Sequence, residues 1–169
     1  ASPDQQHRRL RQAAEDFPLV PQQKDTDRFT VSAHILQSSL RNVATAASLS
    51  DIKPEIASVF MSFNHQKAAF AATDSFRLAE QQINGVFGDK GWSQVFLLPV
   101  RSANELTHLL EREDGDVVVS LGGGQVVFQT KRFRMVSHLT EGSFPDYQRI
   151  VPTVFTTEFT LPKDVLLDM

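Results

Sequence analysis

Two pairs of side chains have the types needed for acid–base chemistry: Asp74 with Glu80, and Asp146 with His138. Such pairs can serve as general acid and base in hydrolysis. Nothing in their spacing selects either pair, and carboxylates at turn edges more often cap backbone amides. A small hydrolase using Asp74 or Asp146 is therefore a low-ranked interpretation, third after the two described below. We expect no catalytic residue and no enzymatic activity.

A phosphate or metal site is also poorly supported. Gly122, Gly123 and Gly124 lie between two β-rich runs and lack the Lys-Ser/Thr pair of a nucleotide-binding loop, so a hairpin turn is the better interpretation. The chain has no cysteine, and its five histidines are scattered. We expect neither a metal nor a cofactor.

Charge gives a weak indication of a polyanionic partner. The net charge is −3, so any contact with nucleic acid must come from local patches. No acidic residue lies between Asp27 and Asp51, a region that includes Arg41, and Lys53 and Arg101 could extend the same patch. Ordinary surface charge explains these residues equally well.

The hydrophobic pattern predicts the elements that would position these groups. The longest apolar stretch, Val95–Val100, is too short for a membrane helix, and the absence of cysteine suits a reducing cytoplasm, which we expect to be the location. A Ser102/Glu105 capping box marks the second of two expected helices. We expect helices at 32–48 and 102–113, and strands at 56–63, 68–73, 76–83, 95–98, 117–121, 126–130 and 133–139.

The sequence repeats itself. Phe29 and Phe96, which open similar short segments before the two helices, lie 67 residues apart, and Phe159 opens a third such segment 63 residues later. This predicts an α+β fold of two half-units related by a pseudo-two-fold axis, with two helices packed on antiparallel sheets. We expect a complete domain at 28–152, the end of a preceding domain and a linker at 1–27, and a linker with the truncated start of a third domain at 153–169, as in a fragment of a longer protein.

Two motifs carry a family resemblance. The segments Ala72–Ala79 (ATDSFRLA) and Gly142–Tyr147 (GSFPDY), together with Leu98-Pro99, resemble the middle domain of the bacterial DNA polymerase III β subunit family, the replicative sliding clamps. The resemblance implies the DNA clamp fold, with two β-α-β-β-β half-units per domain. It also implies a ring of two three-domain subunits around duplex DNA, a processivity factor that tethers the polymerase.

The family resemblance also implies two functional surfaces. Arg41, Lys53 and Arg101 would face duplex DNA in the ring without reading its sequence. A hydrophobic groove would bind short peptides of the DNA polymerase III α subunit, the clamp loader δ subunit and repair polymerases. Its side contributed by this chain would comprise Lys53, Ile56, Thr73, Phe76, Arg77, Leu78, Pro145, Arg149 and Ile150, here called the groove set.

The groove set departs from the family pattern. Ser75 and Phe76 stand where the family usually has Gly and His or Tyr, Ser58 where it often has Gly, and Lys53 replaces a usual Arg. Two alternatives stay open: Ile56 and Leu78 could be ordinary core residues, and the protein could be a clamp-like peptide-binding scaffold that does not encircle DNA.

Overall fold

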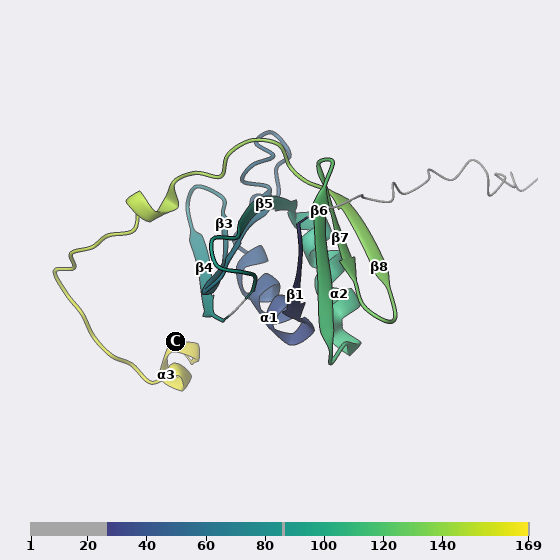
Figure 1. Ribbon diagram of the computed structural model, residues 1–169. Helices are drawn as coiled ribbons and strands as arrows, with labels where there is room; N and C mark the ends of the chain where they lie inside the picture. The colour runs from purple at the N-terminus through teal and green to yellow at the C-terminus, as the bar shows by residue number, and fades with distance from the viewer. Residues whose placement is uncertain (1–26, 86, 169) are drawn as a thin grey trace, which may run out of the picture.

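The fold consists of two four-stranded antiparallel sheets with two helices between them. The structure, a computed structural model, describes residues 27–85 and 87–168. Figure 1 shows the order of the elements along the chain. They are β1 (Arg28–Ser32), α1 (Ala33–Ala44), β2 (Ser58–Asn64), β3 (Lys67–Thr73), β4 (Leu78–Asn84), β5 (Ser93–Pro99), α2 (Val100–Leu109), β6 (Asp116–Gly122), β7 (Gln125–Gln129), β8 (Arg134–His138) and α3 (Lys163–Leu167).

The two half-units exchange their first strands. One sheet has the order β4-β3-β2-β5 and the other β1-β6-β7-β8, so each takes one strand from the opposite half-unit. The exchange is symmetric in register, because Phe29 lies opposite Val119 and Phe96 lies opposite Met61. The α+β class and the twofold repeat predicted from the sequence are therefore confirmed.

The exchange also explains where the helices begin. The amide of Ala33 donates to the carbonyl of Gly115 at 2.9 Å, and that of Val100 donates to the carbonyl of Ala57 at 3.0 Å. In both cases the acceptor immediately precedes the strand that pairs with the helix's own leading strand. Backbone carbonyls thus satisfy the first amide of each helix without a side-chain cap.

The capping-box prediction is wrong for this reason. Helix α2 starts at Val100, so Ser102 and Glu105 lie inside it, and Ser102 Oγ accepts a hydrogen bond from Ser137 Oγ at 2.8 Å. Ser32 does precede α1, but its side chain makes no capping bond, and α1 ends at Ala44 rather than near residue 48.

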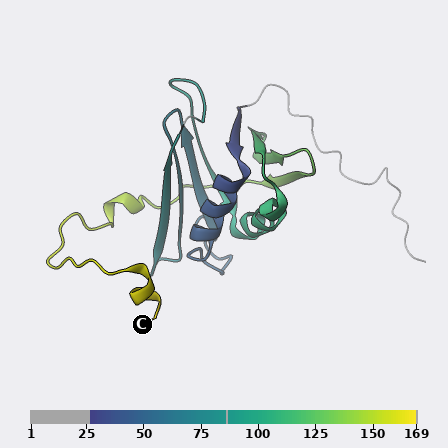
Figure 2. The same ribbon diagram turned by 90° about the horizontal axis from the view of Figure 1, so that it is seen from below.

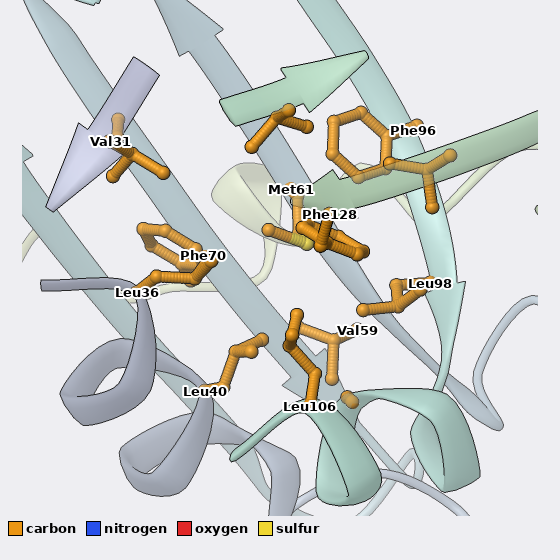
Figure 3. Close-up of a cluster of buried hydrophobic side chains, with 14 of the residues drawn as sticks. Val31, Leu36, Leu40, Val59, Met61, Phe70, Phe96, Leu98, Leu106 and Phe128 are labelled. Carbon is orange, nitrogen blue, oxygen red and sulfur yellow. The ribbon is translucent and has the colours of Figure 1, made fainter. Parts of the chain in front are cut away.

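The core lies where the helices meet both sheets. Leu36, Leu40 and Leu106 are fully buried, and they share one cluster with side chains from the two sheets, including Phe70 and Phe128. Figure 3 shows these side chains converging from α1, α2 and the strands. Seen from below in Figure 2, the two helices lie side by side between the sheets.

Several boundaries move from their predicted positions. β4 begins at Leu78, which leaves Phe76 and Arg77 in a turn, and β8 ends at His138. The glycine segment is a hairpin turn, as predicted, with Gly123 and Gly124 at positive φ. No helix within the described residues is both long and apolar enough to span a membrane.

Candidate functional site

The turn between β3 and β4 holds two members of the groove set, Phe76 and Arg77, in a hydrogen-bonded loop. Asp74 Oδ1 accepts from the amides of Phe76 and Arg77, each at 3.0 Å, and Asp74 Oδ2 accepts from Arg77 Nε at 2.9 Å. The two amide bonds, with the adjacent Arg77, keep the pKa of Asp74 below its ordinary value. Ser75 has φ +79°, a conformation that L residues rarely adopt. The turn thereby presents Phe76 98% exposed.

Thr73 and Leu78 close this turn as paired residues at the end of the sheet. Thr73 is buried, and its hydroxyl donates to the carbonyl of Arg77 at 2.7 Å. Leu78 is half-buried and lies outside the core cluster. Leu78 is therefore available at the surface and is not an ordinary core residue.

The loop before β2 contributes Lys53 and Ile56. The carbonyl of Lys53 accepts from the amides of Ile56 and Ala57, at 3.2 and 3.1 Å, while the residue itself is exposed. Ile56 is 8% exposed and lies outside the core cluster. Because β2 begins at the end of the sheet where β3 finishes, this loop and the Thr73–Leu78 turn lie at the same end.

A segment after β8, residues 139–150, crosses the outer face of the β4-β3-β2-β5 sheet, and we call it the strap. In Figure 1 it runs from β8 past β5 toward β3 and β4. Its first contacts with this sheet are made by Thr140, whose amide donates to the carbonyl of Leu97 and whose hydroxyl lies 2.7 Å from Ser58 Oγ. Phe144 then packs on Phe60, with ring centroids 5.3 Å apart.

Near its end the strap carries a buried tyrosine, which the sequence patterns did not mark as a site residue. Tyr147 is 5% exposed, and its hydroxyl donates to Glu80 Oε1 on β4 at 2.7 Å. Burial, together with the adjacent Glu80, raises the pKa of Tyr147 to about 12. The signal that could have revealed it is in the sequence, because Tyr147 is the chain's single tyrosine and closes the GSFPDY motif.

Pro145, Arg149 and Ile150 lie on either side of Tyr147 and are exposed. Arg149 Nε pairs with Asp146 Oδ2 at 3.0 Å, and Ile150 is 68% exposed. Since Glu80 lies two residues beyond Leu78 on the same face of β4, Tyr147 brings this part of the strap to the face that carries Leu78. The nine residues of the groove set thus come from three segments, the loop before β2, the turn between β3 and β4, and the strap, each of which adjoins the β4-β3-β2-β5 sheet.

The predicted DNA-facing residues Arg41 and Arg101 differ from each other in their charged neighbours. Arg41 is exposed on the last turn of α1, and no carboxylate in the described ranges lies within 4 Å of it. Arg101 instead forms an exposed ion pair with Asp51, Nη2 to Oδ2 at 3.0 Å. The exposed face of α2 and the turn after it also carries Glu105 and Glu111, so its charge is mixed.

The candidate acid–base groups are engaged elsewhere. Asp74 bonds within its own turn, Glu80 accepts from Tyr147, and Asp146 pairs with Arg149. His138 Nε2 lies 3.5 Å from Gln125 Nε2 on the neighbouring strand. In the described part of the chain, no three His, Cys, Asp or Glu side chains are grouped so that they could hold a metal ion.

Comparison with known proteins gives consistent similarities over most of the chain. The family model described as "DNA polymerase III beta subunit, central domain" matches residues 30–146. The beta sliding clamp of Pseudomonas aeruginosa is 28% identical over 139 residues, covering 82% of this chain and 38% of the relative. The beta sliding clamp of Staphylococcus epidermidis is 25% identical over 138 residues, covering 82% of this chain and 36% of the relative.

A solved structure has the same fold and a bound ligand. The DnaN sliding clamp (DNA polymerase III subunit beta) from Pseudomonas aeruginosa bound to griselimycin superposes with a TM-score of 0.77 at 26% identity, covering 83% of this chain and 38% of that one. This chain therefore spans well under half the length of the relatives it matches.

Proposed function

We propose, since the chain belongs to the DNA polymerase III beta subunit family and matches its central domain, that it is the middle domain of a sliding clamp. In this proposal the whole protein is a homodimeric ring that encircles duplex DNA and tethers the replicative polymerase without catalysing a reaction. The observation that carries the proposal is the match over residues 30–146, which spans both half-units and ends inside the strap.

The proposed domain organisation is 1–27 as the end of a first domain, 28–152 as the middle domain and 153–169 as the start of a third. Apart from Asp27, the first segment lies outside the described residues. The third segment supports the proposal at α3, which begins directly after Pro162, just as α1 follows Ser32 and α2 follows Pro99.

Duplex DNA would be held by topology rather than by tight contacts. Arg41, Lys53 and Arg101 offer at most three phosphate contacts, and Asp51 competes for Arg101. Each contact makes log affinity fall by about 0.9 per unit of log salt concentration, so the isolated chain should bind duplex weakly at low salt and hardly at physiological salt. Submicromolar binding of duplex DNA by the isolated chain at physiological salt would contradict the proposal that topology, and not tight contacts, holds the DNA.

One observation favours the second candidate, a peptide-binding scaffold that does not encircle DNA. The helix surface is not clearly basic, because Glu105, Glu111 and the Arg101–Asp51 pair offset its arginines. Loading of the full-length parent protein onto circular DNA separates the two. Retention of the protein on circular DNA, with release after the DNA is linearised, supports the clamp. A protein that never forms a ring, or that does not stay on circular DNA, supports the scaffold.

The groove set is the proposed site for short peptides of the polymerase α subunit, the clamp loader δ subunit and repair polymerases. Exposed Phe76 and Ile150 and half-buried Leu78 would bury apolar side chains of a peptide, while Arg77 and Arg149 would orient its polar ends. Affinity for this chain alone should be weak, because the family's groove has a second side in the third domain.

Griselimycin is a suitable probe for this site, because a related clamp was solved with it bound. Titration followed by amide chemical shifts should move signals of Phe76, Arg77 and Ile150 and leave those of the β7–β8 turn in place. Leu78→Asn should weaken binding, and Val136→Asn is a matched control, since Val136 is half-buried on the outer face of the equivalent strand β8. Shifts confined to other surfaces would overturn the proposed site.

A further inference from the structure

Tyr147 is the centre of the strap's contact with the sheet. Its ring packs edge-on against Phe60 and Phe144, with centroids 6.1 and 6.0 Å away. Its hydroxyl reaches Glu80 Oε1 at 2.7 Å, and Gln82 Nε2 donates to the same oxygen at 2.8 Å. Gln82 on the same strand therefore helps to orient Glu80 so that its carboxylate accepts the hydrogen bond from the tyrosine hydroxyl.

The backbone of Tyr147 fixes its neighbours. The amide of Tyr147 donates to the carbonyl of Pro145 at 2.7 Å, and its carbonyl accepts from the amide of Ile150 at 3.1 Å. Arg149 completes the 3₁₀ turn that Tyr147 begins. The three groove-set residues of the strap are thus tied to the one residue whose side chain is buried.

In the far end of the strap, residues 145–150, Tyr147 is the one described residue whose side chain is buried. Asp146, Gln148, Arg149 and Ile150 are all exposed. The contacts of Thr140 and Phe144 hold only the beginning of the strap, beside β5 and β2. Without the Tyr147–Glu80 bond, the Pro145–Ile150 segment would keep no hydrogen bond to β4 among those the described residues form.

We propose that Tyr147 is a positioning residue for the groove, and that its hydrogen bond to Glu80 holds Pro145, Arg149 and Ile150 beside Leu78. The inference rests on the proposed function, because it concerns the same groove. It adds a pair of residues, neither of them in the groove set, that determine whether the strap side of the groove is preformed. A preformed side lowers the entropy cost of binding a peptide.

The test uses single changes that separate the hydrogen bond from packing. Tyr147→Phe removes only the hydroxyl, Glu80→Leu removes the acceptor, and Glu80→Gln keeps an acceptor oxygen. Gln81→Leu is the matched control, since Gln81 Oε1 accepts a 2.7 Å bond from Asn42 on the opposite face of the same strand. Two readouts apply: exchange of the Ile150 amide with solvent, and affinity for griselimycin.

Tyr147→Phe and Glu80→Leu should each speed exchange at Ile150 and weaken griselimycin binding by about tenfold, the effect of losing one hydrogen bond to a charged group. The double variant should be no weaker than either single variant, and Glu80→Gln should restore most of the binding. Absorbance of the phenolate gives a direct signature, because the chain has a single tyrosine: Glu80→Leu should lower the pKa of Tyr147 from about 12.

Several results would overturn the inference. They are unchanged exchange at Ile150 in Tyr147→Phe, losses of affinity that multiply in the double variant, or equal losses in Gln81→Leu. Failure of the wild-type chain to bind griselimycin would count against the proposed groove instead. In that case exchange at Ile150 still decides whether Tyr147 positions the strap.

Discussion

The turns that end β3 and β7 are equivalent in the two half-units and use the same hydrogen bonds. Asp74 Oδ1 accepts from the amides two and three residues ahead, and Thr130 Oγ1 accepts from Arg132 and Phe133 in the same way, at 3.1 and 3.2 Å. In each turn the capping residue's own amide donates to the carbonyl three residues ahead, at 3.4 Å for Asp74 and 2.9 Å for Thr130.

The residues that these turns expose are quite different. The first turn presents a 98% exposed phenylalanine beside an arginine paired with the cap, whereas the second presents Lys131 and Arg132 and turns Phe133 toward the core. The repeat therefore determines backbone geometry, while the exposed side chains diverge. An exposed feature such as the Phe76–Arg77 turn can therefore belong to one half-unit and be absent from its equivalent.

The largest expected effect tests whether the half-units share one core. Phe70 and Phe128 occupy equivalent strands and are both fully buried. Phe70→Ala and Phe128→Ala should each lower the free energy of unfolding by about 3–5 kcal/mol, with one transition in denaturant. Two separate transitions would show that the half-units unfold independently.

Loss of a turn cap should have a smaller effect. Thr130→Ala removes the acceptor for two amides and should lower the free energy of unfolding by about 1 kcal/mol, as measured by chemical denaturation. Thr130→Ser keeps the hydroxyl and serves as the control. Equal stability of the two variants would mean that the side-chain oxygen contributes nothing to the turn.

Acid should loosen only the first turn. The amides of Phe76 and Arg77 favour ionised Asp74 and hold its pKa below the ordinary 3.8, so its contribution to stability is complete above pH 3.8 and is lost as the pH falls through the lower folded value. The amide shifts of Phe76 and Arg77 should titrate together below pH 3.8 in wild type and not in Asp74→Asn. Parallel titration of the Phe133 amide would remove the distinction between the turns, whereas the Arg132 amide is unsuitable because Arg132 Nε lies 3.8 Å from Glu113 Oε1.

The smallest effect concerns the exposed phenylalanine itself. Phe76→Ala should change the free energy of unfolding by no more than about 0.5 kcal/mol, because the side chain is 98% exposed. Phe133→Ala should cost about 1–2 kcal/mol, because Phe133 is half-buried against the core. Thermal unfolding of both variants measures the difference, and a large loss in Phe76→Ala would mean that Phe76 packs against part of the protein.

The sequence predicted local features better than long-range ones. The repeat at Phe29 and Phe96 was detectable because each residue opens a short apolar segment that leads directly into a helix, and the ladder places the two residues at equivalent positions. The capping box was misleading, because a Ser-x-x-Glu pattern also occurs inside exposed helices. Here the carbonyl of Ala57, distant in sequence, satisfies the amide that starts α2.

Among the site residues too, local contacts could be predicted from the sequence and long-range contacts could not. The turn chemistry of Asp74 is local, and the groove set came from the family resemblance. The bond between Tyr147 and Glu80 joins residues 67 positions apart, and the pairing of Arg101 with Asp51 spans 50. No spacing rule predicts which distant polar side chains meet, because that depends on the path of the strap and on the loop before β2.

The exchange of leading strands has a consequence for how the chain folds during synthesis. β1 is made early, but its partner β6 follows only after both helices and four further strands. Until β6 leaves the ribosome, β1 has an unpaired edge and α1 lacks part of the surface on which it packs. Pairing between segments so far apart is slow and leaves apolar surface exposed while it is awaited. The first half-unit therefore cannot complete its strand pairing by itself, and the β1–β6 ladder can form only after β6 has been synthesised.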